Sequence, residues 1–237
     1  MSTFILVHGA FSGAWCWKKV IPLLELHGHR VLAVDLPSHG EDLTPVSTVT
    51  LEHYTNHLQR VIENEPSDVI VVGHSLGGLV ISQTAERIPT KIKSLVYIAA
   101  LLPENGQSFL HMNEKNAQAL PLPITMSEDQ THFKLDVSSI RDNFYGESSE
   151  EDVRYAKSKH GDQPLAPFVT PVMLSDENYG SIKRYYIETL KDHSLSISFQ
   201  REMTKQVPCE KVFTLDTDHS PFFSDVTNLV SILNELG

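Results

Sequence analysis

The sequence predicts an α/β fold, with a mainly parallel β-sheet of about six strands and helices on both of its faces. Three observations lead to this prediction. Short apolar runs rich in β-branched residues recur along the chain, as in strands buried on both faces of a sheet. Segments with apolar residues at helical spacing lie between these runs, and this alternation requires right-handed crossovers between parallel strands. One strand, at 69–72, runs directly into a Gly-x-Ser-x-Gly turn and then into a helix.

Strands and helices alternate through the first hundred residues. We expect strands at 3–7, 30–35, 69–72 and 94–99. The helix between the first two strands has Gly28 as its C-cap, and Pro22 leaves open whether this helix starts late or is kinked. The next helix follows Thr50, a good N-cap, and stops before Pro66. The helix after the third strand extends to about residue 88.

This alternation stops between residues 102 and 180. Prolines at six positions and polar helical stretches such as 148–159 do not fit the strands of a sheet. A long insertion between core elements is more often a lid or a binding element than an idle loop. We therefore expect a core that begins at 1–101, a helical cap inserted at 102–180, and the second part of the core at 181–237.

The core pattern resumes after the cap. Strands are expected at 183–189 and 211–215, with a helix at 196–204 between them. The final helix carries apolar residues at helical spacing, with Ser224 as its N-cap and Asp225 in its first turn.

Composition argues against several classes of function. A chain of 237 residues, 41% of them hydrophobic, can bury a large core. The formal charge of −11 and the lack of a basic patch argue against a nucleic-acid partner. The N-terminal apolar run is too short for a signal peptide, and no segment approaches the length of a membrane span. Cys16 and Cys209 could form one disulfide, but two cysteines make no disulfide framework, so we expect a cytoplasmic protein.

Ser75 is the candidate nucleophile. It stands at the centre of Gly73-His-Ser-Leu-Gly77, between a predicted strand and a predicted helix, which is the context of a nucleophile elbow. The backbone of a serine at the apex of so sharp a turn is strained, and side chains at positions 73 and 77 would collide with the neighbouring strand and helix. The alternative is an ordinary strand-to-helix loop whose serine only caps the helix.

A serine hydroxyl needs a base that takes its proton. Of the twelve histidines, His219 lies a few residues after the last strand, where the chain order serine, acid, histidine places the base. His74 lies within the elbow and points away from the site if Ser75 points outward. For His8, at the end of the first strand, we expect a structural hydrogen bond.

The acid that orients the imidazole should follow a sheet strand between Ser75 and His219. Asp192 fits because it comes directly after the strand at 183–189. Three rivals are less suited, because they lie too close to the histidine in sequence or within the strand itself: Asp216, Asp218 and Glu188.

Two backbone N–H groups are candidates for an oxyanion hole. One follows the nucleophile, at Leu76, where the N-terminus of the helix adds its dipole. The other should come from the loop after the first strand, at 8–13, which is rich in small residues. Ala10 is the best candidate in this loop.

The motifs of the chain resemble the α/β-hydrolase superfamily. They are Val-His-Gly-Ala-(x)2-Gly-Ala-Trp at 7–15, Gly-His-Ser-Leu-Gly-Gly at 73–78, Tyr-Ile-Glu-(x)3-Asp at 186–192 and Asp-His-Ser-Pro-Phe-Phe at 218–223. More closely, the chain resembles the branch of plant methyl-ester esterases, hydroxynitrile lyases and bacterial carboxylesterases, including pyrethroid hydrolases. The resemblance implies a helical cap after the sixth strand of that fold and no metal or organic cofactor. It also implies a triad of Ser75, Asp192 and His219, with Ala10 and Leu76 as the oxyanion donors.

Departures from this branch narrow the expected function. Its hydroxynitrile lyases carry a threonine in the first loop and a lysine after the catalytic histidine, where this chain has Phe11 and Ser220. Without the lysine no cation stabilises departing cyanide, so cyanohydrin cleavage is not expected as the main activity. Ser75 also argues against haloalkane dehalogenases, which use aspartate, and against cofactor-independent dioxygenases, which usually lack a working serine there.

We therefore expect a serine carboxylesterase that hydrolyses a small, largely apolar ester through an acyl-enzyme intermediate. Five aromatic residues are candidates for the lining of an apolar substrate pocket, although aromatic residues more often pack in the hydrophobic core: Phe11, Trp15, Phe109, Phe168 and Phe222. A lactone or thioester hydrolase with the same triad stays open, as does a small-molecule receptor on this fold. A homodimer is compatible with the sequence.

Overall fold

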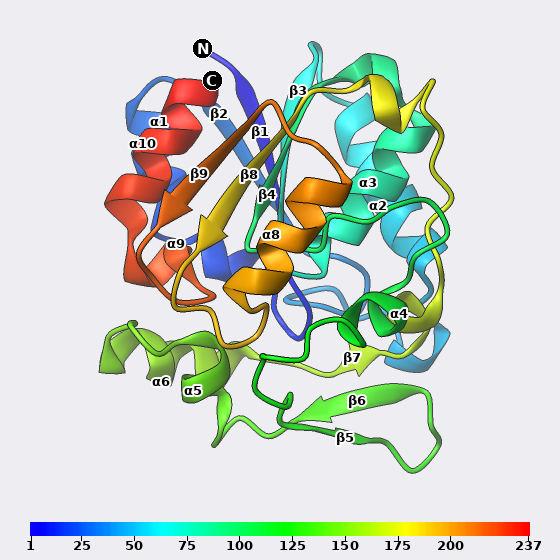
Figure 1. Cartoon of the computed structure of the whole chain (residues 1–237), viewed down its shortest axis with the longest axis vertical. Helices are drawn as coiled ribbons and strands as arrows, with labels where there is room; N and C mark the ends of the chain where they lie inside the picture. The colour runs from blue at the N-terminus through cyan, green and yellow to red at the C-terminus, as the bar shows by residue number, and fades with distance from the viewer.

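The structure, a computed structural model, describes all 237 residues (Figure 1). Its central sheet has six strands in the order β2-β1-β3-β4-β8-β9, and every neighbouring pair is parallel. The strands are β1 (Thr3–Val7), β2 (Arg30–Val34), β3 (Val69–His74), β4 (Ile92–Ile98), β8 (Arg184–Thr189) and β9 (Lys211–Leu215). The predicted α/β fold with a parallel sheet of about six strands is confirmed.

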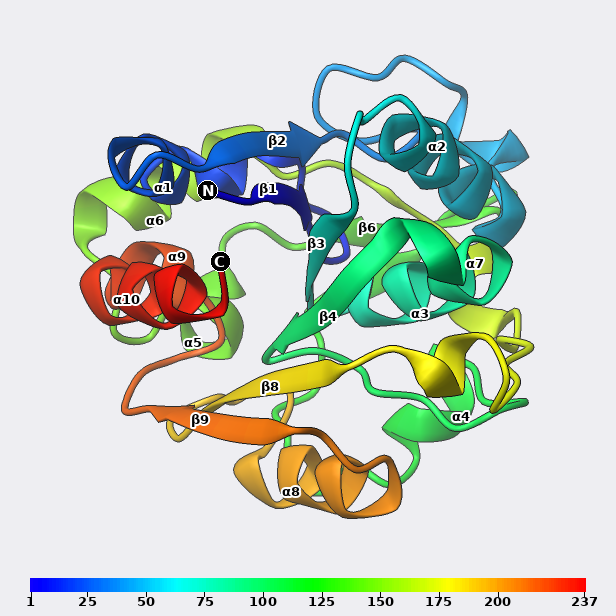
Figure 2. The same ribbon diagram turned by 90° about the horizontal axis from the view of Figure 1, so that it is seen from above.

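Helices cover both faces of the sheet (Figure 2). One face carries α1 (Val20–Leu26) and α10 (Val226–Leu236), and the other carries α2 (Leu51–Glu63), α3 (Gly77–Arg87) and α8 (Ile197–Gln206). Successive side chains of a strand point to opposite faces. In β1, Phe4 and Leu6 therefore pack with the residues of α1 and α10, whereas Ile5 and Val7 pack with those of α2 and α3.

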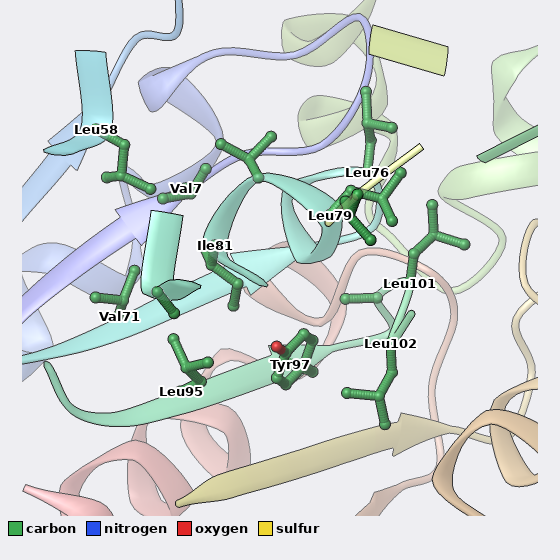
Figure 3. Packing of buried hydrophobic residues seen from close by; sticks show 14 of the residues in the cluster. Val7, Leu58, Val71, Leu76, Leu79, Ile81, Leu95, Tyr97, Leu101 and Leu102 are labelled. Carbon is green, nitrogen blue, oxygen red and sulfur yellow. The ribbon is translucent and has the colours of Figure 1, made fainter. Parts of the chain in front are cut away.

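Part of the larger apolar cluster lies between the strands and α3 (Figure 3). Val71 of β3 and Leu95 and Tyr97 of β4 point toward Leu79 and Ile81 of α3, and all five side chains are fully buried. Burial of an aliphatic side chain of this size contributes about 1.5–3 kcal/mol. This packing holds the start of α3, and the turn in front of it, firmly against the sheet.

Local sequence signals explain two of the helix ends. Thr50 and His53 form a capping box in front of α2, in which each side chain accepts a hydrogen bond from the other residue's backbone N–H. Gly28 stands just beyond α1 with φ of +82°, a conformation that favours glycine and ends the helix. Pro22 lies in the first turn of α1, where its missing N–H breaks no helical hydrogen bond.

The last helix begins differently from the prediction. Ser224 is not its N-cap, because Ser224 ends a separate short helix, α9 (Pro221–Ser224). The Ser224 hydroxyl instead donates a 2.6 Å hydrogen bond to Oδ1 of Asp218. Because the Ser224 hydroxyl bonds to Asp218 on a neighbouring loop, it does not cap the last helix.

The insertion between β4 and β8 lies over the carboxyl ends of the strands, and both chain termini lie at the opposite end of the molecule (Figure 1). Its helices are α4 (Phe109–Asn113), α5 (Ile140–Phe144), α6 (Glu150–Lys159) and α7 (Ala166–Val169). The expected helical cap also contains an antiparallel sheet of β5 (Ile124–Met126), β6 (His132–Leu135) and β7 (Gln163–Pro164). These strands have two to four residues, too few to show an alternating pattern. The domain boundaries at 101 and 180 stay a prediction.

Single turns of 3-10 helix complete the chain: η1 (Ala14–Trp17), η2 (Val46–Thr48), η3 (Pro89–Lys91) and η4 (Tyr179–Ser181). Both cysteines, Cys16 and Cys209, are free. None of the helices has the length and apolar character that crossing a membrane requires.

Candidate active site

Ser75 occupies the sharp turn between β3 and α3, with φ of +52°. A non-glycine residue in this region stores roughly 1–3 kcal/mol of strain, which the surrounding packing must hold. The small residues around it allow that packing: a Cβ at Gly77 would lie 2.8 Å from the His8 carbonyl oxygen, and one at Gly9 would lie 2.8 Å from Cβ of Ser75. The start of α3 has no side-chain capping bond, so this serine does not serve as a helix cap.

Asp192 and His219 meet at the carboxyl edge of the sheet. Asp192 follows β8 and His219 follows β9, and Oδ2 of Asp192 lies 2.7 Å from Nδ1 of His219. Both side chains are buried. Because an ionised carboxylate only accepts hydrogen bonds, Nδ1 of His219 carries the proton and Nε2 is left free to accept one.

The Asp192 carboxylate is held by donors from its own loop and from α8. Its Oδ1 accepts from the backbone N–H groups of Ser194 at 2.7 Å and Leu195 at 2.8 Å. Its Oδ2 also accepts from the Thr189 hydroxyl at 3.2 Å and from Nε2 of Gln200 at 3.3 Å. Gln200 is fully buried, so this carboxylate is fixed in place by the interior of the protein.

The three rival carboxylates are engaged elsewhere. Asp218 accepts from the N–H and hydroxyl groups of its own loop and of the cap, and none of its hydrogen bonds reaches His219. Glu188 forms a two-pronged ion pair with Arg201, and the exposed Asp216 lies 3.5 Å from the Lys191 ammonium.

Two other histidines near the site have structural roles. His8 donates from Nδ1 to the Gly9 carbonyl at 2.8 Å and accepts at Nε2 from the Leu36 N–H at 3.1 Å, and burial lowers its pKa to about 4. His74 is among the residues that line the cavity, and its Nε2 donates to the His219 carbonyl oxygen at 2.8 Å. Burial, and secondly the nearby His219, keeps the pKa of His74 well below its usual value. Both rings are therefore neutral around pH 7.

Ser75 and His219 line the same cavity, which has about 610 Å³ of empty space with its mouth included. The Ser75 hydroxyl makes no hydrogen bond within the protein, and this includes His219. Hydrogen bonds between catalytic groups are often long or poorly aligned in unliganded enzymes, so this does not argue against the pair. Eleven of the nineteen lining residues are hydrophobic, so the cavity suits a largely apolar molecule. Four of the five predicted aromatic residues are among them: Phe11, Phe109, Phe168 and Phe222.

Trp15 does not line this cavity, contrary to expectation. It packs instead between the first loop and the cap, with ring centroids 5.8 Å from Tyr155 and 5.2 Å from His160. Polar lining residues that the sequence did not single out are Ser12, Asn113, His160 and Ser194. Most of these come from the cap or from loop ends, whose folding follows no periodic pattern.

The two predicted oxyanion donors also line the cavity. Ala10 follows β1 and Leu76 follows Ser75, and neither backbone N–H has an acceptor within the protein. A backbone N–H without a partner is uncommon in a folded protein and suggests a group that receives its acceptor from a ligand. No group of three or more His, Cys, Asp or Glu side chains is arranged to hold a metal ion.

Comparisons with known proteins agree with this architecture. The profile of the Alpha/beta hydrolase family matches residues 4–231. Methylesterase 3 of Arabidopsis thaliana is 34% identical over 98% of this chain and 94% of its own length. Three longer chloroplastic relatives from the same plant are 37 or 38% identical, and this chain spans 55 to 63% of their lengths.

Solved structures extend the likeness to the whole fold. A pyrethroid hydrolase from Sphingobium faniae JZ-2 superposes with a TM-score of 0.89 and 32% identity, covering 99% of this chain and 96% of its own. Tomato methylketone synthase I, complexed with 2-tridecanone, superposes with a TM-score of 0.90 and 28% identity, covering 99% and 97%. Because the family profile and these superpositions span nearly all of the sequence, the chain belongs to the alpha/beta hydrolase family.

Proposed function

We propose that the chain is a serine carboxylesterase that hydrolyses a small, largely apolar ester through an acyl-enzyme intermediate. One observation carries the proposal. Ser75, on its strained turn, shares an apolar cavity with a histidine that is hydrogen-bonded to a buried aspartate and with two backbone N–H groups that have no acceptor. This set of groups is what acyl transfer requires: a nucleophile, a base with an orienting acid, and an oxyanion hole.

In the first half of the reaction, Ser75 Oγ bonds to the ester carbonyl carbon while its proton moves to Nε2 of His219. The carbonyl oxygen becomes an oxyanion that accepts hydrogen bonds from the N–H groups of Ala10 and Leu76. The bond to the leaving oxygen then breaks, and His219 returns the proton to that oxygen, which departs as an alcohol. Asp192 stabilises the imidazolium while it exists, as its 2.7 Å contact with Nδ1 of His219 allows.

In the second half, water attacks the acyl-enzyme carbonyl and gives its proton to Nε2 of His219. The bond to Ser75 Oγ breaks, the serine recovers its proton, and the carboxylic acid leaves. A lactone or a thioester would react by the same steps, so the cavity and not the triad selects among these substrates.

Methyl esters of apolar acids are the first substrates that we would test. The apolar lining of the cavity favours such an acyl group, and Methylesterase 3 and other relatives are named as methylesterases. The proposed cytoplasmic location has the support of the two free thiols. A homodimer stays a prediction.

The experiment compares the wild-type protein with Ser75→Ala on a panel of p-nitrophenyl and methyl esters. We expect the variant to lose at least about a thousandfold in kcat/KM. A fluorophosphonate should label the wild type at Ser75 and leave the variant unlabelled. Ser158→Ala, which changes an exposed serine on α6, is the matched control and should behave as wild type. A folded wild type that shows neither turnover nor labelling would contradict the esterase proposal and favour a small-molecule receptor.

A further inference from the structure

Phe11 links the catalytic core to the cap. It follows the proposed oxyanion donor Ala10, its ring lines the cavity, and its φ is +61°. A large side chain in this backbone region is strained, so the surrounding structure must hold it there. Both backbone polar groups of Phe11 receive their partners from the cap, more than a hundred residues away in sequence.

Three hydrogen bonds form this attachment, which we call the Phe11 clamp. The Phe11 carbonyl oxygen accepts from Nδ1 of His160 at 2.8 Å and from the N–H of Gly161 at 3.0 Å. The Phe11 N–H donates to Oε1 of Gln163 at 3.3 Å. The two peptide groups on either side of Phe11 are therefore fixed by one short segment of the cap.

The clamping side chains are themselves held. Gln163 is fully buried and donates from Nε2 to the Tyr54 hydroxyl at 3.2 Å and to the Pro164 carbonyl at 3.1 Å. His160 has Tyr145 as its second partner, at 2.8 Å from Nε2. Because Nδ1 of His160 donates to a carbonyl, Nε2 accepts from the tyrosine hydroxyl. Burial lowers the pKa of His160 to about 4, so this pattern of donors is stable at neutral pH.

We propose that His160 and Gln163 are positioning residues, which act through the peptide groups of Phe11 to keep the Ala10 N–H aimed at the oxyanion. This inference rests on the proposed function. An oxyanion donor works only if it is already aligned when charge develops. Without the clamp, Phe11 would relax toward an ordinary backbone conformation and turn the preceding residue with it. The cap would then contribute to the rate of reaction and not only to the choice of substrate.

The test uses Gln163→Met, which keeps the side-chain length and removes the acceptor of the Phe11 N–H. Gln163 does not line the cavity, so ground-state binding should change little. We expect kcat for a p-nitrophenyl ester to fall between about tenfold and a hundredfold, with KM within about threefold of wild type. The inhibition constant of a trifluoromethyl ketone, which adds to the serine and fills the oxyanion hole, should rise by the same factor as kcat falls. That of the matching methyl ketone should not change.

Gln107→Met is the matched control, because Gln107 is another buried cap glutamine whose side chain bonds only to Glu104. It should leave kcat and both inhibition constants near their wild-type values. A second pair tests the other side of the clamp: His160→Leu removes the donor to Phe11, and His160→Asn restores an N–H near the position of Nδ1. We expect the asparagine variant to regain most of the kcat that the leucine variant loses, and this pair carries the test if Gln163→Met does not fold.

Two results would overturn the inference alone: wild-type kcat in both Gln163→Met and His160→Leu, or equal weakening of the trifluoromethyl and methyl ketones. The second result would indicate a distorted cavity and not a misplaced oxyanion donor. A wild type that hydrolyses no ester and is not labelled at Ser75 would instead overturn the proposed function, and the inference with it.

Discussion

Replacing Asp192 by asparagine would test whether this residue, and not another nearby carboxylate, is the acid of the proposed triad. Oδ1 of Asp192 accepts from two backbone N–H groups at 2.7 and 2.8 Å, and these donors cannot turn away. The amide oxygen of an asparagine would therefore take the Oδ1 position. Its NH2 group would then face Nδ1 of His219, where the carboxylate oxygen accepted a 2.7 Å hydrogen bond.

This arrangement reverses the tautomer of His219. To accept from the amide, Nδ1 must lose its proton, and Nε2 then carries it and cannot take the proton of Ser75. In a serine protease the same exchange lowers kcat by about 10⁴-fold, which corresponds to about 5.5 kcal/mol of transition-state free energy. We expect a loss of at least about 10³-fold here, because the two backbone donors leave the amide only one orientation.

The assay is kcat for a p-nitrophenyl ester, with thermal unfolding measured on the same samples. Asp218→Asn is the informative control, since this buried carboxylate accepts four hydrogen bonds and does not contact His219 through any of them. It should lower the free energy of unfolding by about 1–3 kcal/mol and reduce kcat far less than Asp192→Asn does. The exposed neighbour Asp216, changed to asparagine, should have no effect on either quantity.

The opposite ranking would refute this reasoning. If Asp218→Asn lost more kcat than Asp192→Asn while both proteins stayed folded, the acid of the triad would be assigned wrongly. If neither variant lost more than about tenfold, the orientation of the imidazole would not depend on a carboxylate, and the triad mechanism would fail with it.

Three further predictions follow from the packing and the buried histidines. A Cβ on Gly78 would overlap the carbonyl oxygen of Leu101, so Gly78→Ala should lower the free energy of unfolding in urea by about 1–3 kcal/mol, and a loss below about 0.5 kcal/mol would contradict this. Thr50→Ala removes the capping box of α2 and should lower the free energy of unfolding by about 1 kcal/mol. Thr48→Ala is the control, because the Thr48 hydroxyl bonds to the Pro45 carbonyl and does not cap α2. Burial lowers the pKa values of five histidines, so the unfolded chain binds more protons than the folded one between about pH 6.5 and 5: His8, His39, His57, His74 and His160. Stability should therefore fall as the pH falls through this window, and urea titrations that show uptake of less than one proton on unfolding would be inconsistent with it.

The core of the fold could be predicted because its signals are local and repeated. The strands at 3–7 and 211–215 have the predicted bounds. The first is buried on both faces and is an almost continuous apolar run, whereas the second lies at the edge of the sheet and buries only Phe213 and Leu215. The meeting of Asp192 with His219 follows from the same logic. Both residues were placed just after parallel strands, and the carboxyl ends of neighbouring parallel strands lie at one edge of the sheet.

The two errors have a common physical cause, which is competition from partners that the local sequence pattern does not include. Serine is a favoured N-cap residue, but the hydroxyl of Ser224 bonds to Asp218 on the preceding loop. Trp15 is a large aromatic residue of the kind that lines apolar pockets, but its ring packs against Tyr155 and His160 of the cap. Asp218 lies only six residues before Ser224, but nothing in the sequence shows that its carboxylate turns toward this hydroxyl. The partners of Trp15 lie in the cap, whose strands are too short to reveal their pairing in the sequence.

The cap therefore does more than cover the cavity, because it holds two loops of the core at once. His160 and Gln163 hold the loop of Phe11, and the backbone N–H of Glu147 donates a 2.9 Å hydrogen bond to Asp218, the residue before His219. The partners in these contacts are separated by 71 to 152 residues, so no local pattern records them. A segment that swung away as a free lid would break both attachments and release the proposed base and the proposed oxyanion donor together. The stretch from Glu147 to Gln163 should thus stay in place during turnover, and access to Ser75 should depend on other parts of the cap.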